Sequence, residues 1–170
     1  NIDNILSETD AVMIARGDLG LEFPVEDVPL LQKELIKKCN NKGIPVITAT
    51  QMLESMISNP RPTRAEASDV ANAVYDGSDA LMLSGETSVG AYPIDAVENM
   101  INIIKKVESK IYNLPFGDRL YDNLEYTIID AIAHASTVIA EQIDGSAIVI
   151  LSSTNIALKK VAKYRPRIPI

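Results

Sequence analysis

The chain has 170 residues, of which 46% are hydrophobic, and a formal net charge of −7 at pH 7. This apolar content can form a buried core, and the negative charge argues against nucleic acid or an anionic membrane as a partner, because both are bound mainly by excess Lys and Arg. We expect a cytoplasmic protein, because the chain has a single cysteine, Cys39, no recognisable signal peptide and no apolar run of the roughly 18 to 20 residues that span a bilayer.

Three short apolar runs each lead into a polar cluster and predict the strands of a parallel sheet. They are residues 11–14 before ARGDLG, 45–48 before ATQMLESM and 80–83 before SGET. The polar residues Asp18, Thr50 and Ser84 in these clusters follow one another at the spacing of a βαβ unit, roughly 30 residues. Strands that repeat in this way run in the same direction, with one helix between successive strands.

Apolar residues in the segments between and after these runs recur at the spacing of a helix face. Pro29 suits the first turn of one helix, and Gly43 suits the position just past its end. Thr63 and Glu66, three residues apart, are typical of a capping box at the start of the next helix. We therefore expect helices over about residues 29–42, 63–76 and 93–111.

The pattern changes at residues 113–123, NLPFGDRLYDN, whose Pro, Gly, Asp and Asn content is typical of a connection. Beyond this connection, the periodicity predicts a helix at 128–139, a strand at 147–151 and a helix at 158–164. A second, smaller α/β unit is therefore expected to begin here. The chain starts abruptly at NIDNIL and ends at RPRIPI with no closing element, so we expect both ends to be cut.

A parallel sheet of three strands has two open edges and buries little surface, so the first unit should be part of a larger sheet. Three βα repeats followed by a long helix suit the closing portion of a (β/α) barrel. An open doubly wound sheet is the alternative, and the GxGxxG fingerprint that such a fold often carries is absent. We expect the last three βα units of a TIM-type barrel in residues 1–112, then the beginning of a smaller α/β domain in 113–170.

The three polar clusters should face a common site, because parallel sheets bind ligands at the carboxyl ends of their strands. The carboxylate of Asp18 can ligate a hard cation such as Mg²⁺, or it can cap the following turn. At Gly17 the backbone can approach a ligand closely, or the glycine can serve a tight turn with positive φ. Thr50 offers a hydroxyl that both donates and accepts, although a β-branched residue is also ordinary at a strand end.

Six motifs of the chain, in the same order, resemble those of pyruvate kinase. They are ARGDLG, ATQMLESM, RPTRAE, SDVANAV, MLSGET and YRPRIPI, and together they extend over essentially the whole chain. The resemblance implies part of the catalytic barrel and the start of the C-terminal regulatory domain. It also implies the glycolytic transfer of a phosphoryl group between phosphoenolpyruvate and ADP, giving pyruvate and ATP, with Mg²⁺ (or Mn²⁺) and K⁺, by a homotetramer.

The resemblance implies a role for individual residues. It makes Asp18 a metal ligand that also contacts the substrate together with Gly17. Thr50 would bind the substrate close to the carbon that exchanges a proton, and Ser84 would belong to a hydroxyl and water relay, for which a simple turn is an equal alternative. Arg64 would lie at a subunit contact near the active site, and its alternative is a solvated surface arginine.

Other polar residues have expected roles outside this set. Arg16 is expected to be a structural ion-pair partner rather than a phosphate ligand, and Glu86 to orient its neighbours. Residues 152–154 (Ser152, Ser153, Thr154) stand where relatives that respond to a sugar bisphosphate carry a phosphate loop, and their hydroxyls could donate to a phosphorylated effector. Asn155 and Ile156 replace the glycine and arginine that are frequent there, so the effector stays open.

The lysine and metal-binding glutamate of the family's KIE motif, and its nucleotide and potassium contacts, are absent from these residues. The chain alone is therefore expected to be inactive. Two alternatives stay open. One is a metal-dependent barrel lyase acting on a pyruvate enolate, which would use the same carboxylate and amide groups without a nucleotide. The other is a non-catalytic effector-binding or assembly module.

Overall fold

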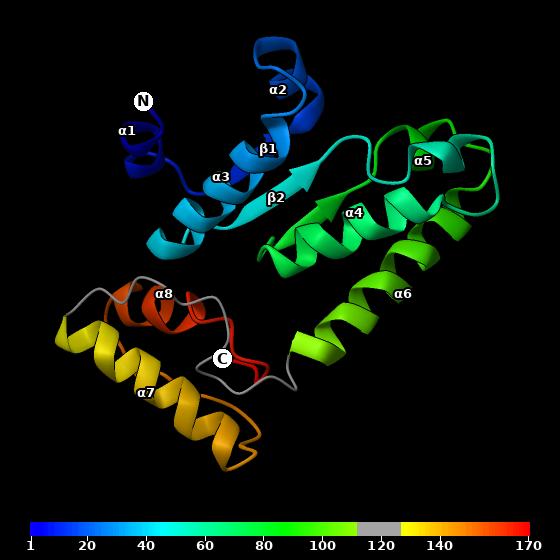
Figure 1. Cartoon of the computed structure of the whole chain (residues 1–170). Coiled ribbons are helices and arrows are strands. Elements are labelled where there is room, and N and C mark those ends of the chain that lie inside the picture. Colours follow the sequence, from blue (N-terminus) through cyan, green and yellow to red (C-terminus); the bar gives the residue numbers. More distant parts are fainter. Residues whose placement is uncertain (112–126) are drawn as a thin grey trace.

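The computed structural model describes residues 1–111 and 127–170 of the chain. The expected connection at 113–123 and the expected domain boundary at 112/113 lie outside these described residues. A sheet with its helices forms the first part of the structure, and a pair of packed helices follows after the gap (Figure 1).

The predicted parallel sheet is present. It contains β1 (Val12–Ala15), β2 (Val46–Ala49) and β3 (Ala80–Met82) in the order β1-β2-β3. Both strand pairs are parallel, with Ile14 opposite Thr48 and Thr48 opposite Leu81. All three strands therefore end at one edge of the sheet, as the repeat spacing predicts.

Helices follow each strand along the chain. After α1 (Ile2–Ser7) and β1 come α2 (Arg16–Glu22) and α3 (Val28–Lys42); after β2 come the 3-10 turn η1 (Glu54–Ile57) and α4 (Arg64–Tyr75); after β3 come α5 (Gly85–Ser88) and α6 (Pro93–Ile111). The predicted helices α3, α4 and α6 are confirmed. Helices α1, α2 and α5 are short and were not predicted, because too few residues lie on one face of such a helix to make a period visible.

Sequence signals at the helix ends act as predicted. Gly43 follows α3 with φ of 68°, a left-handed conformation that favours glycine. At the start of α4 the Thr63 side chain accepts from the backbone N of Glu66, and the Glu66 carboxylate accepts from the backbone N of Thr63 at 2.7 Å. These reciprocal bonds satisfy two backbone donors that the helix itself leaves without partners.

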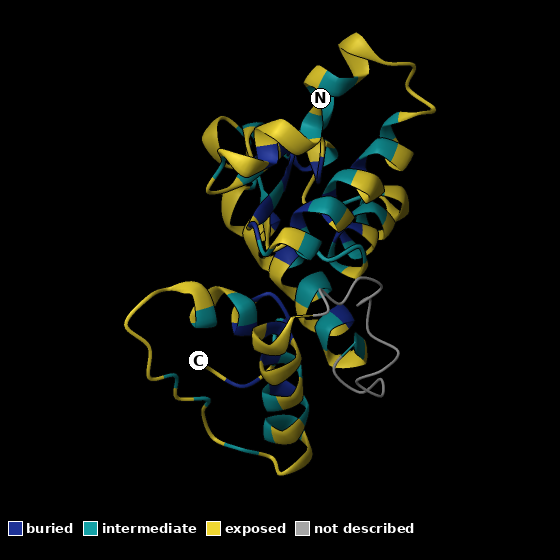
Figure 2. Ribbon diagram, turned by 90° about the vertical axis from the view of Figure 1, so that its left-hand side faces the viewer, coloured by how far each residue is buried: buried dark blue, intermediate teal, exposed yellow. Residues whose placement is uncertain are grey.

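In the first part of the structure, two clusters of buried residues lie between the sheet and its helices (Figure 2). One cluster joins the segment after β2 to the buried faces of α4 and α6 and contains Met52, Leu53, Met56, Val70, Ala73, Ala96 and Met100. The other joins β1, β2 and α3 and contains Leu6, Ile14, Ile36, Cys39, Ile44 and Val46. These clusters fix the positions of the strand ends, where the predicted site lies.

The residues after the gap form α7 (Ile128–Gln142) and α8 (Ile156–Ala162), which pack against each other. The carboxylate of Asp130, which is fully buried, accepts from Lys163 Nζ at 3.2 Å and from the Tyr164 hydroxyl at 2.7 Å. Burial alone would raise the pKa of Asp130, but the bonds from Tyr164 and Lys163 outweigh it and lower this pKa. The polar triad therefore ties the two helices together as an ionised carboxylate.

The strand predicted at 147–151 is wrong. These residues form no ladder with any described segment; Ile148 N donates to Pro169 O at 2.9 Å, and Val149 and Leu151 are 82% and 96% exposed. A strand is defined by repeated backbone bonds to a neighbour, and the apolar pattern cannot reveal whether that neighbour is present. Ile148 and Ile150 nevertheless pack against the cluster between α7 and α8, as their hydrophobicity predicts.

Arg165 bonds the second part of the structure to the first. Its guanidinium donates to the two carboxylate oxygens of Asp79 at 2.7 and 2.8 Å and to Asn40 Oδ1 at 2.6 Å. Asp79 lies directly before β3, so this contact is at the amino edge of the sheet.

Among the described residues, the helices are too short or too polar for any of them to cross a bilayer.

Candidate functional site

The predicted site residues follow the carboxyl ends of the three strands. Gly17 and Asp18 follow β1 on α2, Thr50 follows β2, and Ser84 lies between β3 and α5. In Figure 1 the arrowheads of β2 and β3 point to the side of the sheet where α5 lies, directly after Ser84. The parallel topology therefore brings the three clusters to the same edge of the sheet, as predicted.

Two of the clusters are in direct contact. The backbone N of Gly17 donates to Thr50 Oγ1 at 2.9 Å. Gly17 is the second residue of α2 and has no positive φ, so the alternative of a tight left-handed turn is wrong at this position. Because Thr50 Oγ1 accepts from this amide, its own proton is directed to another group, and a bound ligand could receive it.

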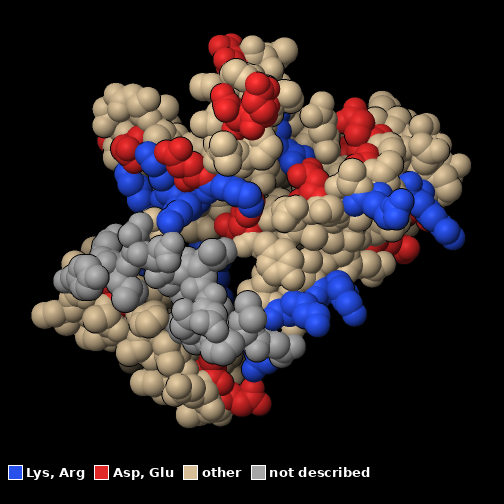
Figure 3. Space-filling view, in the orientation of Figure 1, with Lys and Arg blue, Asp and Glu red and all other residues tan. Residues whose placement is uncertain are grey.

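Asp18 is the third residue of α2, where the sequence suggested only a turn. No side chain caps this helix, so the alternative role of Asp18 as a cap is wrong. Asp18 is exposed. It lies in the first turn of α2, where the helix dipole favours a negative charge. Further acidic residues, Glu22, Glu26 and Asp27, are exposed nearby in the chain, and acidic side chains gather around α2 in Figure 3. An anionic ligand here would need a cation beside Asp18.

The turn after β2 has an unusual backbone. Thr50 and Gln51 have φ of 69° and 53°, the left-handed region that non-glycine residues rarely adopt. Arg16 Nη2 donates to the carbonyl oxygens of both residues, at 2.7 and 3.2 Å, and Arg16 Nη1 bonds to the Asp69 carboxylate at 2.6 Å. The expectation that Arg16 is a structural ion-pair partner is confirmed, and Asp69 and Gln51 are residues of this region that the sequence did not indicate.

Glu86 fixes the third cluster. It is 2% exposed, and its carboxylate accepts from the backbone N of Leu53 at 3.0 Å and of Ser84 at 2.8 Å. It therefore joins the chain after β2 to the chain after β3, which agrees with the expected orienting role. Ser84 itself is exposed, and its side chain makes no cap bond to α5.

The remaining predicted site residues lie elsewhere. Arg64 is the first residue of α4 and is exposed. Ser152 Oγ donates to Thr154 O at 2.6 Å and accepts from Thr154 N at 3.3 Å, so this exposed loop before α8 folds on itself. Ser153 is exposed in the same loop. The loop of residues 152–154 belongs to the part of the structure that bonds to the amino edge of the sheet through Arg165, whereas Arg64 begins the helix whose Asp69 bonds to Arg16.

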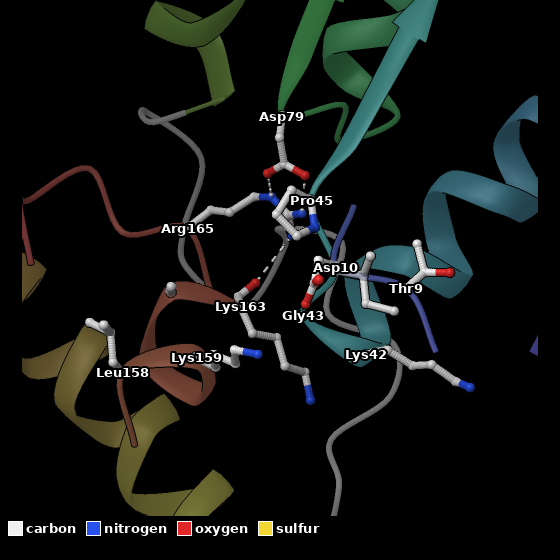
Figure 4. A pocket seen from close by; sticks show the side chains of 12 residues that line it. Thr9, Asp10, Lys42, Gly43, Pro45, Asp79, Leu158, Lys159, Lys163 and Arg165 are labelled. Carbon is white, nitrogen blue, oxygen red and sulfur yellow. Dashed lines mark hydrogen bonds and ion pairs between the residues drawn. The ribbon is translucent and has the colours of Figure 1, made fainter. Parts of the chain in front are cut away.

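A hollow of about 420 Å³ lies at the opposite, amino edge of the sheet, between α3 and α8 (Figure 4). Its charged side chains include the Asp79–Arg165 pair, which the figure shows bonded across it. Its lining residues are Thr9, Asp10, Lys42, Gly43, Ile44, Pro45, Asp79, Leu158, Lys159, Ala162, Lys163 and Arg165. None of the predicted site residues is among them, so this hollow is separate from the site.

Comparison with known proteins identifies the relatives of this chain. The family model described as "Pyruvate kinase, barrel domain" matches residues 1–97. The pyruvate kinase of Bacillus licheniformis is 52% identical over 170 residues, all of this chain and 29% of that protein. The soybean (Glycine max) "Pyruvate kinase, cytosolic isozyme" is 51% identical over 172 residues, all of this chain and 34% of that protein.

A solved structure agrees with these relatives. The crystal structure of a pyruvate kinase from Cryptosporidium parvum matches with a TM-score of 0.84 and 44% sequence identity, over 99% of this chain and 34% of that one. The chain thus spans about a third of the length of the proteins it matches. The barrel-family model, the sequence identity and the shared fold all extend over the segment that contains Gly17, Asp18, Thr50 and Ser84. This chain belongs to the pyruvate kinase family.

Proposed function

We propose that the full-length protein containing this chain transfers a phosphoryl group between phosphoenolpyruvate and ADP, giving pyruvate and ATP in glycolysis. The observation that carries the proposal is the bond from Gly17 N to Thr50 Oγ1 at 2.9 Å, next to the exposed Asp18, in a chain of this family. This arrangement offers a hydroxyl and a carboxylate at the strand edge where α/β enzymes bind their substrates.

Asp18 fits the role of a ligand to Mg²⁺ or Mn²⁺. Its carboxylate is exposed, and it is the kind of hard oxygen ligand that Mg²⁺ prefers. No group of three metal-binding side chains occurs among the residues that the structure describes, so Asp18 would supply one ligand, with substrate oxygens, water or other parts of the protein completing the shell. When bound, the metal neutralises charge on the substrate. The proposal also includes K⁺ but assigns it no residue of this chain.

Thr50 would hold the substrate and act close to its proton transfer. Gly17 N already occupies one acceptor position of the Thr50 hydroxyl, so the orientation of its O–H is restricted. A group of fixed orientation loses little freedom when it binds, which favours catalysis. Ser84, whose backbone is held by Glu86, would extend this group as part of a hydroxyl and water relay.

The architecture of the full-length protein is also a proposal. Residues 1–112 would form the last three βα units of the barrel, and 113–170 would begin a C-terminal regulatory domain. Arg64 is exposed at the start of α4 and would lie at a subunit contact of a homotetramer. The loop of Ser152, Ser153 and Thr154 would face a phosphorylated effector, and the protein would be cytoplasmic.

The test is an Asp18→Ala variant of the full-length protein, assayed with phosphoenolpyruvate, ADP and saturating Mg²⁺. We expect turnover to fall by several orders of magnitude, because charge neutralisation at the reacting phosphoryl group is lost. Asp27→Ala is the matched control, since Asp27 is exposed in the same acidic region and its side chain makes no cap bond to α3. It should keep normal turnover.

Other outcomes would contradict the proposal. Near-normal turnover of Asp18→Ala would reject the metal-ligand role. Activity of the wild-type protein on an aldol substrate without ADP would favour the lyase. If the wild-type protein showed neither phosphoryl transfer nor turnover of an aldol substrate, a binding or assembly module would be favoured. The names of the relatives favour neither alternative.

A further inference from the structure

We propose that Arg16, held in place by Asp69, is a positioning residue for Thr50. The pair keeps the backbone of Thr50 and Gln51 in the left-handed conformation and thereby places the Thr50 hydroxyl at the site. This inference rests on the proposed function, because it concerns the same hydroxyl. It adds Arg16 and Asp69 to the residues of the proposed site. Asp69 is on α4, outside the polar clusters that follow the strands.

The conformation to be stabilised is strained. Thr50 and Gln51 both have positive φ, and neither is glycine. A β-branched residue such as Thr50 is a particular outlier there, because its Cβ crowds the backbone. Consecutive residues in this region persist only when surrounding contacts hold them, and such strain is typical of functional sites.

Arg16 supplies these contacts. Its Nε and Nη2 donate to Thr50 O at 3.3 and 2.7 Å, and Nη2 also donates to Gln51 O at 3.2 Å. One guanidinium therefore binds both carbonyl groups of the strained pair. If Thr50 and Gln51 rotated to ordinary φ values, their carbonyl groups would turn and these bonds would break.

Asp69 holds the guanidinium in the required orientation. Its carboxylate bonds to Arg16 Nη1 at 2.6 Å, and Gln32 Oε1 accepts from the same nitrogen at 3.4 Å. The Arg16 side chain is only 10% exposed. A guanidinium is planar, so fixing Nη1 on one side directs Nε and Nη2 towards the turn. The bonds of Arg16 to Asp69, Thr50 and Gln51 thus join the chain after β1, the turn after β2 and helix α4.

The hydroxyl of Thr50 depends on this backbone. Thr50 Oγ1 accepts from Gly17 N at 2.9 Å, and Gly17 directly follows Arg16 in the chain. A change of φ at Thr50 rotates its Cα–Cβ bond and moves Oγ1 away from that amide. Among the described residues, the Arg16 guanidinium bonds to backbone carbonyl groups and to side chains of the turn and its neighbours. We therefore expect Arg16 to act on the substrate indirectly, by positioning Thr50.

A double-mutant cycle in the full-length protein tests the proposal. Asp69→Asn, Thr50→Val and the double variant are compared for kcat, for KM and for exchange of the pyruvate methyl protons with solvent. We expect Asp69→Asn alone to lower kcat and the exchange rate by about tenfold, and by less than about twofold in the Thr50→Val background, because interacting residues are not additive. Arg16→Lys should reproduce the loss, since one ammonium cannot bind both carbonyls and Asp69.

The control is Asp3→Asn. Asp3 lies on α1 and, like Asp69, pairs with a cation, Lys38 Nζ at 3.2 Å, but it has no bond to Arg16 or to Gln32. It should leave kcat and the exchange rate unchanged. Equal losses from Asp69→Asn in both Thr50 backgrounds would overturn the proposal, as would an Asp69→Asn crystal structure with poorly bonded Arg16 but unchanged φ at Thr50. If the wild-type protein transfers no phosphoryl group, the proposed function fails. Comparison of φ at Thr50 between crystal structures of the wild type and of Asp69→Asn then still tests whether Arg16 and Asp69 position Thr50.

Discussion

Replacing Asp130 by Asn should destabilise the contact between α7 and α8 more than any surface substitution. The carboxylate of Asp130 is fully buried and bonds to Lys163, which is 7% exposed, and to Tyr164, which is 1% exposed. Asn can still accept from the tyrosine, but it leaves the Lys163 ammonium buried without its opposite charge. Breaking a buried pair in this way costs about 3 to 5 kcal/mol.

Hydrogen exchange of the full-length protein measures this loss locally. At 1.4 kcal/mol per tenfold, the lower figure corresponds to a fall of about two orders of magnitude in the protection of the α7 and α8 amides. Asp144→Asn is the matched control. Asp144 also bonds to a cation, Arg167, at 2.9 Å, but its side chain is 90% exposed, and protection should not change. A fall of less than threefold in the Asp130 variant would refute the reasoning.

The same pair predicts a dependence on pH. Because the pKa of Asp130 is lowered in the folded protein, its stabilisation is present above the unfolded value of about 3.9 and is lost as the pH falls through the folded value. Protection of α7, corrected for intrinsic exchange, should therefore stay constant from pH 7 to pH 5 and fall below about pH 4. Asn at position 130 does not titrate, so this contribution to the fall should be missing from the variant.

Two further predictions concern the ends of helices, measured by thermal or urea unfolding. Thr63→Ala removes the side chain that accepts from Glu66 N and should destabilise α4 by about 1 kcal/mol. Gly77→Ala should cost about 1 to 3 kcal/mol, because φ at Gly77 is 96° and an added Cβ would lie 2.4 Å from Asn40 Nδ2. Gly20→Ala is its control, since no atom lies within 4 Å of a Cβ there and alanine favours a helix; it should not destabilise the protein.

Sequence predicted the parts of the fold that local chemistry determines. The start of α4 is an example, because Thr63 and Glu66 are three residues apart and their bonds do not depend on distant segments. The direction of the strands was predictable for a similar reason, since each repeat leaves room for one crossover helix. Convergence of the polar clusters at one edge then followed from topology.

Other features depend on partners that are distant in the chain. Arg16 and Asp69 are 53 positions apart, and nothing around either residue indicates the other. The left-handed backbone of Thr50 and Gln51 has no signature, because neither residue is the glycine that normally reveals positive φ. The strand predicted at 147–151 was wrong because pairing is a property of two segments, whereas hydrophobicity is a property of one.

The Asp79–Arg165 bond gives the second helix pair a mechanical connection to the proposed catalytic hydroxyl. Asp79 Oδ2 also accepts from Val46 N, at the root of β2, and Thr50 stands at the tip of the same strand, four residues and about 13 Å away. Ladders to β1 and β3 on its two flanks hold β2 against sliding along its axis. The Asp79–Arg165 bond therefore anchors α7 and α8 to a strand whose position in the sheet is fixed, the same strand that Thr50 follows.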